Sequence, residues 1–208
     1  EQAVLREVRA FSWKTSPRVN VPALKSETSD KAEWPDLWGV TGFLHLDGTR
    51  MAAAPTAINL ARTKTHLFIG IMAEDPMPHA TGASITKRDA PLWEEESVEV
   101  RIRPAGQPAR RFFVNPLGTQ HDAMIVAENM DCWDAGWDAD WRVQTENTET
   151  GWTATIMLPF SILGGTPEKR TEWDVNFIRH RNNVEKEKSA WAVSSISDIT
   201  SYGTLVFE

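Results

Sequence analysis

Clustered carboxylates are the first feature of this sequence whose spacing could perform chemistry. Three glutamates, Glu94–Glu96, precede a β-prone segment, and Asp131, Asp134, Asp138 and Asp140 fall close together. Two carboxylates can hydrolyse a glycosidic bond, whereas an acidic loop attracts calcium, because hard cations take oxygen ligands. We favour the solvated or calcium-binding loop, with Asp75 or the segment 131–140 as the expected place for a structural calcium ion, and the individual ligands stay unassigned.

Other signatures of catalysis or of metal binding do not occur in the sequence. The five histidines show no His-x-x-x-His spacing, and there is no nucleophile elbow, phosphate-binding loop or dinucleotide fingerprint. Cys132 is the single cysteine, so neither an internal disulfide nor a cysteine metal cluster can form. We therefore predict no catalytic residues and no required cofactor.

Tryptophan is the unusual residue type, with ten copies against one tyrosine. An indole offers a large, flat apolar face, which serves a protein core and equally serves as a stacking surface for a ligand. Sugar rings present one apolar face of C–H groups and a rim of hydroxyls. The tryptophan count is therefore the first hint of carbohydrate binding.

The segments that would carry these residues read as β-strands. Ser97–Arg103 alternates strictly, with Val98, Val100 and Ile102 on one face, and Pro104–Pro108 reads as the turn of a hairpin. Helical periodicity is scarce beyond one turn at Ser161–Gly164. The further expected strands are Ala57–Ala61, His66–Ala73, Arg110–Asn115, Trp141–Thr145, Trp152–Leu158, Trp173–Arg181, Ala190–Ser194 and Thr204–Phe207.

Short strands separated by Pro and Gly turns predict an all-β fold, namely a two-sheet antiparallel β-sandwich of jelly-roll or immunoglobulin-like type with little helix. We expect one domain over residues 1–208, with an irregular N-terminal segment around 1–37. The net charge of −7 without a basic patch disfavours nucleic acid as a partner. No apolar run spans a membrane, and the start at Glu1 leads us to expect a secreted, periplasmic or cell-surface protein whose signal peptide has been removed.

Five stretches of the chain together resemble the family 9 carbohydrate-binding modules and the related cytochrome- and sugar-binding β-sandwich domains. The resemblance covers residue 38 to the end and depends on the order and spacing of the stretches rather than on one motif. They are PTAINLARTKTHLFIGIMAED (55–75), DAPLWEEESVEVRIR (89–103), FFVNPLGTQHD (112–122), GWTATIMLPFSIL (151–163), and the closing part from Trp173 to Phe207.

This resemblance implies a site in which two tryptophans sandwich a sugar. Trp93, six residues before Glu99, matches the first, and Trp191 matches the second. We expect both in one shallow cleft at one end of the sandwich, where loops gather.

The hairpin alternation adds polar candidates to this cleft. If Phe112 and Val114 point inward, Arg111 and Asn115 share a face with Glu99, and the three could form a polar floor between the tryptophans. A cross-strand salt bridge is the competing interpretation. Arg179 is expected to be a buried structural arginine instead.

The predicted function is non-catalytic binding of a mono-, oligo- or polysaccharide, with a glycan-degrading enzyme as a candidate partner. Three alternatives stay open. Related sandwiches hold haem b through Met with His or Lys, and Met72, Met124, Met157 and His180 would be the candidates here. The others are a polysaccharide-active lyase or hydrolase, and a structural module whose sugar site has decayed.

Overall fold

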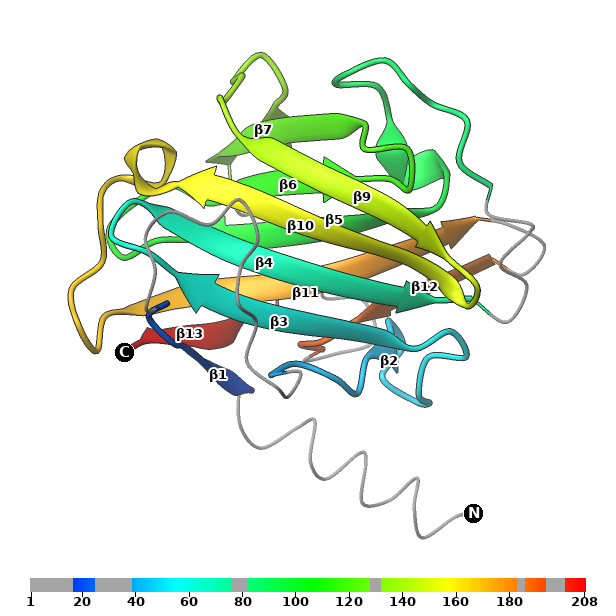
Figure 1. Ribbon diagram of the computed structural model, residues 1–208, viewed down its shortest axis with the longest axis horizontal. Helices are drawn as coiled ribbons and strands as arrows, with labels where there is room; N and C mark the ends of the chain where they lie inside the picture. The colour runs from blue at the N-terminus through cyan, green and yellow to red at the C-terminus, as the bar shows by residue number, and fades with distance from the viewer. Residues whose placement is uncertain (1–16, 25–38, 76–81, 128–131, 183–185, 194–200) are drawn as a thin grey trace, which may run out of the picture.

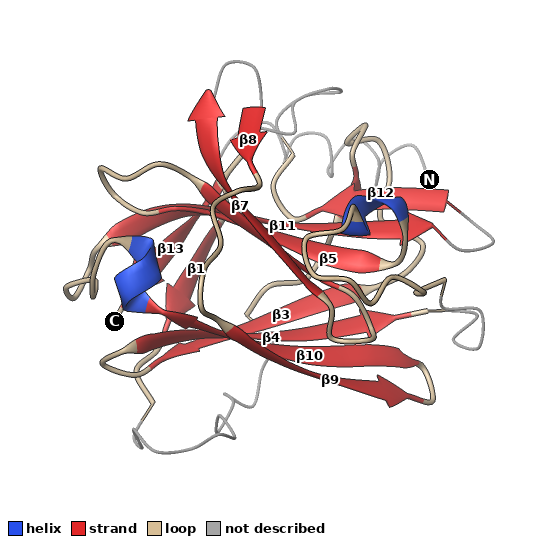
Figure 2. Cartoon of the chain, turned by 90° about the horizontal axis from the view of Figure 1, so that it is seen from above, coloured by secondary structure: helices blue, strands red, loops and turns tan. Residues whose placement is uncertain are grey.

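Two stacked β-sheets form the protein in a computed structural model that describes residues 17–24, 39–75, 82–127, 132–182, 186–193 and 201–208. Figures 1 and 2 show the layers, with β3, β4, β10 and β9 on one side and β11, β5, β6 and β7 on the other. The predicted all-β sandwich is confirmed. Among the described residues, no helix is both long and apolar enough to cross a membrane.

The smaller sheet has the order β3-β4-β10-β9 and is antiparallel throughout. Its strands are β3 (Thr56–Arg62), β4 (His66–Glu74), β9 (Arg142–Thr148) and β10 (Gly151–Pro159). Gly151, with φ +151°, begins β10 where a Cβ atom would lie 2.1 Å from the carbonyl oxygen of Ala73. Glycine is therefore required at this close approach of two backbones.

The larger sheet has the order β1-β13-β11-β5-β6-β7-β8, with β12 pairing both β11 and β2 at its side. Its pairs are antiparallel except for β1 with β13. The strands are β1 (Arg18–Val21), β2 (Leu44–His45), β5 (Ser97–Arg103), β6 (Arg110–Val114), β7 (Gln120–Ala127), β8 (Cys132–Asp134), β11 (Glu172–Asn182), β12 (Lys186–Ala190) and β13 (Gly203–Phe207).

Alternation along the strands of the larger sheet decides which side chains enter the core. Val98, Val100 and Ile102 are fully buried against the smaller sheet, as are Phe112 and Val114 of β6. The face predicted for Val98, Val100 and Ile102 is therefore confirmed, and the condition that Phe112 and Val114 point inward is met. Residues between them, at odd numbers on β5 and β6, lie on the sheet's other side, which we call the outer face.

A buried polar network ties the two sheets together near one edge of the core. Arg179 of β11 pairs with Glu96 at 2.9 Å and donates to the carbonyl oxygens of Pro55 and Glu74. Trp152 of β10 donates its indole N–H to the same glutamate. Arg179 is 1% exposed, so the predicted structural role of this arginine is confirmed.

Candidate functional site

Trp93 stands at the start of the outer face because a short helical turn lifts it above β5. The 3-10 helix η2 (Leu92–Glu94) is anchored by the buried Leu92, whose carbonyl accepts a 2.7 Å hydrogen bond from the Ser97 hydroxyl. The Trp93 side chain is left 38% exposed, although it is large and apolar. An exposed indole beside a sheet is available to stack on a ligand.

Below Trp93, the sheet surface is aromatic. The ring of Phe113 on β6 lies 5.8 Å from the Trp93 ring, and that of His121 on β7 lies edge-on at 5.3 Å. Phe113 and His121 face each other across the β6–β7 register. Both are 1% exposed, so they support the indole from beneath rather than meet a ligand.

Arg111 and Trp133 continue this surface away from Trp93. The Arg111 guanidinium carbon lies 5.5 Å from the centre of the Trp93 ring and 4.8 Å from that of Trp133 on β8. The centres of the two indole rings are therefore no further apart than the sum of these two distances, and the guanidinium lies near both rings. We call Trp93, Arg111 and Trp133 the tryptophan–arginine stack.

Glu99 lies on the same face but is taken up by its neighbours. It is 1% exposed, accepts a 2.5 Å hydrogen bond from Arg101, and lies 3.1 Å from Nε2 of His180. Burial acts to raise the pKa of Glu99, but the charge of Arg101 and the contact with His180 outweigh it and lower that pKa to about 2. Glu99 therefore offers no free polar contact in this structure, and its ion pair is with Arg101 of its own strand rather than the cross-strand salt bridge of the competing interpretation.

The two histidines of this face are held neutral. Burial lowers the pKa of His180, although its partner Glu99 acts to raise it. Burial also lowers the pKa of His121, and the nearby backbone of Asp89 opposes that shift. The outer face therefore gains no imidazolium charge near pH 7.

Asn115 shapes a loop instead of lining the stack. Its amide donates to the carbonyl of Ile85 and to Glu95, and its oxygen accepts from the backbone N–H groups of Leu117 and Thr119. The side chain is fully buried. Its predicted place in a polar floor is wrong, because these four bonds consume its hydrogen-bonding capacity.

Trp191 lies on the opposite side of the sheet from Trp93. Its backbone N–H bonds to the carbonyl of Phe177, and its ring lies 5.9 Å from the ring of that inward-facing residue and packs against the core. Gly203 makes room for it, since a Cβ atom there would lie 2.4 Å from the indole. Trp93 and Trp191 therefore do not form the two walls of one cleft in this structure.

The haem and calcium candidates are likewise dispersed. His180 faces outward from the larger sheet, whereas Met72 and Met157 face outward from the smaller one, so the structure does not bring them together. Asp75 is buried against Arg181 at 2.8 Å, and Asp138 pairs with Arg88. Within the described ranges, no group of three or more His, Cys, Asp or Glu side chains could hold a metal ion; Asp131 lies outside them.

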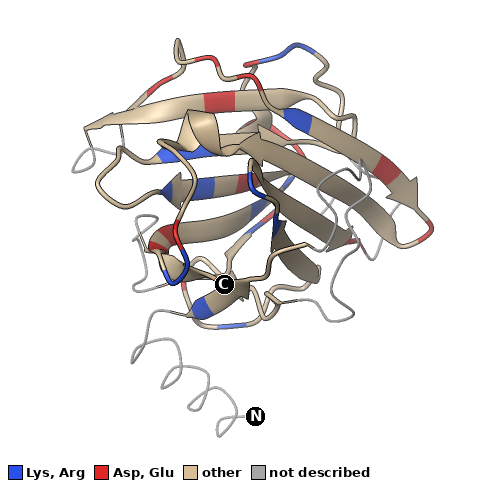
Figure 3. Ribbon diagram, turned by 60° about the vertical axis from the view of Figure 1, so that its left-hand side comes forward, with Lys and Arg blue, Asp and Glu red and all other residues tan. Residues whose placement is uncertain are grey.

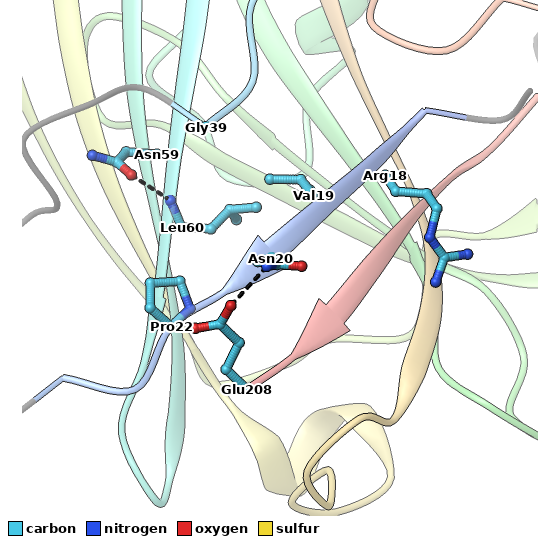
Figure 4. Close-up of a pocket in the computed structure, with 8 residues that line it drawn as sticks. All are labelled: Arg18, Val19, Asn20, Pro22, Gly39, Asn59, Leu60 and Glu208. Carbon is cyan, nitrogen blue, oxygen red and sulfur yellow. Dashed lines mark hydrogen bonds between the residues drawn. The ribbon is translucent and has the colours of Figure 1, made fainter.

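A separate hollow of about 440 Å³ is lined by residues of β1 and β3, among others (Figure 4). It has no aromatic side chain among its described lining, and Asn20 donates a hydrogen bond to Glu208 beside it. Stacking on a sugar is therefore not available there. The lining residues are Arg18, Val19, Asn20, Pro22, Gly39, Asn59, Leu60 and Glu208.

Trp133 is the principal site residue that the sequence did not single out. Its strand, β8, was not predicted, and neither was the neighbouring strand β7. The two strands pair with Trp133 opposite Ile125. A three-residue strand leaves little periodicity to recognise. The available signal was the tryptophan itself, because it lies within an acidic, polar segment where a core residue is not expected.

Comparisons with known proteins agree at the level of the fold. No family model matches the sequence, and no curated protein matches it. A Bacteroides uniformis protein to which carbohydrate binding is attributed superimposes with a TM-score of 0.72 at 12% identity, covering 93% of this chain and all of that one.

Two structures of a family 9 carbohydrate-binding module from Caldicellulosiruptor kristjanssonii also match. The complex with cellotriose has a TM-score of 0.60 at 14% identity, over 92% of this chain and 93% of that one. The complex with glucose has a TM-score of 0.58 at 13% identity, over 92% and 95%. The chain therefore has the fold of the family 9 carbohydrate-binding modules.

Proposed function

We propose that this protein is a non-catalytic carbohydrate-binding domain whose ligand stacks on the outer face of the larger sheet. The observation that carries the proposal is the tryptophan–arginine stack. Trp93 is 38% exposed, and the guanidinium carbon of Arg111 lies 5.5 Å from the centre of its ring. A flat apolar surface with donors at its edge matches a sugar ring with its hydroxyls.

The proposed second aromatic wall is Trp133 rather than Trp191. Trp133 is partly exposed and lies, like Trp93, on the outer face of the larger sheet beside Arg111. Trp191 would have to leave the core to reach a ligand there. The sugar complexes of the family 9 neighbours support carbohydrate as the ligand class, while the residues proposed here come from this chain's own geometry.

Catalysis does not fit this face. A glycosidase needs one carboxylic acid with a raised pKa and a second carboxylate across the sugar. Glu99 has its pKa lowered to about 2 and is buried, so it stays ionised and out of reach. Burial raises the pKa of Glu96, but this side chain lies in the core network and meets no ligand.

We further propose that the ligand is a polysaccharide met outside the cytoplasm, where such a domain would hold a glycan-degrading enzyme near its substrate. A glycan array followed by isothermal titration calorimetry tests the binding function. The expected result is saturable binding of at least one saccharide and no release of reducing sugar by the pure protein. An array without any bound glycan would refute the proposal.

A further inference from the structure

We propose that the protein has a second saccharide site, at the end of strand β5 that lies away from Trp93, where one neutral sugar residue binds. The site is a hollow of about 230 Å³ between the turn that joins β5 to β6 and the segment that follows the 3-10 helix η4 (Phe160–Leu163). We call it the turn hollow. This inference goes beyond the proposed function and does not depend on the tryptophan–arginine stack.

The turn hollow and Trp93 lie at the two ends of β5. Trp93 precedes this strand, whereas Pro104, which lines the hollow, directly follows it. A strand of seven residues spans roughly 23 Å, so one sugar residue cannot occupy both places. Figures 1 and 3 show the segment after η4 passing close to the C-terminus, in agreement with the 2.7 Å hydrogen bond from the Arg170 N–H to the Phe207 carbonyl.

The base of the turn hollow is apolar. The buried residues that line it are Pro104, Leu163, Pro167 and Trp173. The Trp173 ring is held by two aromatic neighbours, with its centre 6.0 Å from that of Phe160 and 4.7 Å from that of Phe207. An apolar base suits the C–H groups of a sugar ring, and a hollow smaller than the usual range of about 300–1,000 Å³ suits one ring rather than several.

The indole N–H of Trp173 supplies a hydrogen-bond donor at this base. Two other buried tryptophans use theirs inside the protein, since Trp141 donates to Asp122 and Trp152 donates to Glu96, both at 3.0 Å. Within the described residues, the Trp173 N–H has no acceptor, and it is not one of the enclosed polar atoms that lack a partner. It therefore reaches solvent, and because Trp173 lines the hollow, a sugar oxygen there can accept from it.

The rim of the turn hollow is polar. The exposed or partly exposed polar residues that line it are Gln107, Thr166, Glu168 and Thr171. The Glu168 carboxylate accepts from hydroxyls and repels an anion, whereas the Gln107 amide both donates and accepts. Figure 3 shows basic positions beside the acidic one on this segment, but their side chains, Lys169 and Arg170, do not line the hollow. Neutral sugar hydroxyls, which donate and accept, therefore fit better than a uronic acid.

The two walls of the turn hollow are held in place by their own backbone. The Gln107 N–H bonds to the carbonyl of Pro104 at 3.0 Å, and the Gly165 N–H bonds to that of Phe160 at 2.9 Å. At Gly164, with φ +94°, a Cβ atom would lie 2.8 Å from Cγ of Gln107, so glycine lets this side chain lie against the opposite wall. A site that is shaped in advance loses less conformational entropy when a ligand binds.

Indole N–H signals in a ¹H–¹⁵N NMR titration test the turn hollow directly. Trp173→Phe assigns the relevant signal by removing it. The probes are the methyl glycosides of glucose, galactose and mannose, each compared with the methyl glycoside of the corresponding uronic acid. We expect at least one neutral glycoside to shift the Trp173 signal saturably with a Kd of about 1–10 mM, as a single sugar ring allows. Its uronic acid should bind at least about tenfold more weakly, because Glu168 repels the carboxylate.

Substitutions at the rim locate the binding. Gln107→Ala and Glu168→Gln should each weaken the binding followed at Trp173 by about three- to tenfold, as loss of one hydrogen bond does. Glu168→Gln should also remove the discrimination against the uronic acid. The matched control is Glu146→Gln, which removes an exposed carboxylate from β9, outside the turn hollow, and should change neither property. Thermal melting confirms that each variant folds.

The outcomes separate this inference from the proposed function. A saturable Trp173 shift that persists in Trp93→Ala and weakens in Glu168→Gln supports a second site, whether or not the stack binds sugar. Absence of a shift with every glycoside up to about 50 mM overturns the turn hollow, and the stack is then judged by its own titration. A shift that disappears in Trp93→Ala also overturns it, because the signal would then report binding at the stack. Equal binding of the neutral glycosides and the uronic acids overturns the ligand class.

Discussion

Replacing Trp93 and Trp191 separately distinguishes the site built here from the two-tryptophan cleft that the sequence suggested. Trp93 is 38% exposed and touches the rings of Phe113 and His121. Aromatic pairs of this kind contribute about 0.5–1.5 kcal/mol. Trp93→Ala should therefore lower the free energy of unfolding by only about 1 kcal/mol. It should weaken sugar binding by about 1–3 kcal/mol, as loss of aromatic stacking does elsewhere.

Trp191→Ala should show the reverse. Its indole packs on Phe177 and fills the space that Gly203 leaves, so its removal opens a cavity beside the core. Fully buried large-to-small substitutions cost about 3–5 kcal/mol, and a half-buried ring about 2–3 kcal/mol. For a domain of this size, the melting temperature should fall by roughly 5–10 °C. Sugar affinity, measured well below that temperature, should stay within about threefold of wild type.

The assay pairs calorimetric titration with urea unfolding for both variants and for Trp133→Ala, which should resemble Trp93→Ala. The informative result is that Trp93→Ala loses binding and keeps most of its stability, whereas Trp191→Ala loses stability and keeps its binding. Loss of binding in Trp191→Ala with stability unchanged would place this indole at the ligand, and it would refute the assignment of Trp191 to the core side of the sheet. Unchanged binding in both Trp93→Ala and Trp133→Ala would refute the outer face as the binding site.

Three further predictions concern stability. Arg179→Gln should lower the free energy of unfolding in urea by about 3–5 kcal/mol, because Glu96 would stay buried without its partner. The control is the exposed pair of Arg18 with Glu172, where Arg18→Gln should change the free energy of unfolding little. Glu99 has a folded-state pKa lowered from 4.5 to about 2, so its ionisation stabilises the fold fully above pH 4.5 and that contribution, about 3 kcal/mol, is lost as pH falls toward 2. Glu99→Gln should therefore flatten the acid limb of a stability–pH curve, and an unchanged limb would contradict the ion pair. The loop calcium stays a prediction: EDTA should lower the melting temperature and calcium chloride restore it, whereas a melt insensitive to EDTA would count against it.

Regular alternation is what made much of the fold predictable. On β5 the apolar residues repeat every second position, so the pattern alone predicted that Val98, Val100 and Ile102 share one face. On β6 the apolar residues Phe112, Phe113 and Val114 are consecutive, so the inward direction of Phe112 and Val114 entered only as a condition. β7 escaped recognition because it buries residues on both faces. Asp122 is fully buried there and accepts from Trp141 and from the backbone of Ala139, a pairing that no local pattern reveals.

The site residues were less predictable because their roles depend on distant partners. The strand expected at Ala190–Ser194 is instead Lys186–Ala190, and part of the expected range lies outside the described residues. Trp191 therefore follows the strand, and its side is decided by the carbonyl of Phe177 and by the absent side chain of Gly203. Asn115 likewise ends a strand, where hydrogen bonds of the following turn outweigh the alternation.

Glu99 illustrates how a residue can matter to this site without meeting the ligand. Its carboxylate holds Arg101, and Arg101 in turn lies over the Trp133 ring that Arg111 also faces. The ion pair thus fixes the position of one guanidinium beneath the stack and neutralises its charge. Because Arg111 stands opposite Arg101 in the register, this neutralisation limits the repulsion that the pair of arginines would otherwise impose on the fold. A buried carboxylate below the surface therefore helps to hold the arginine and tryptophan side chains above it in place.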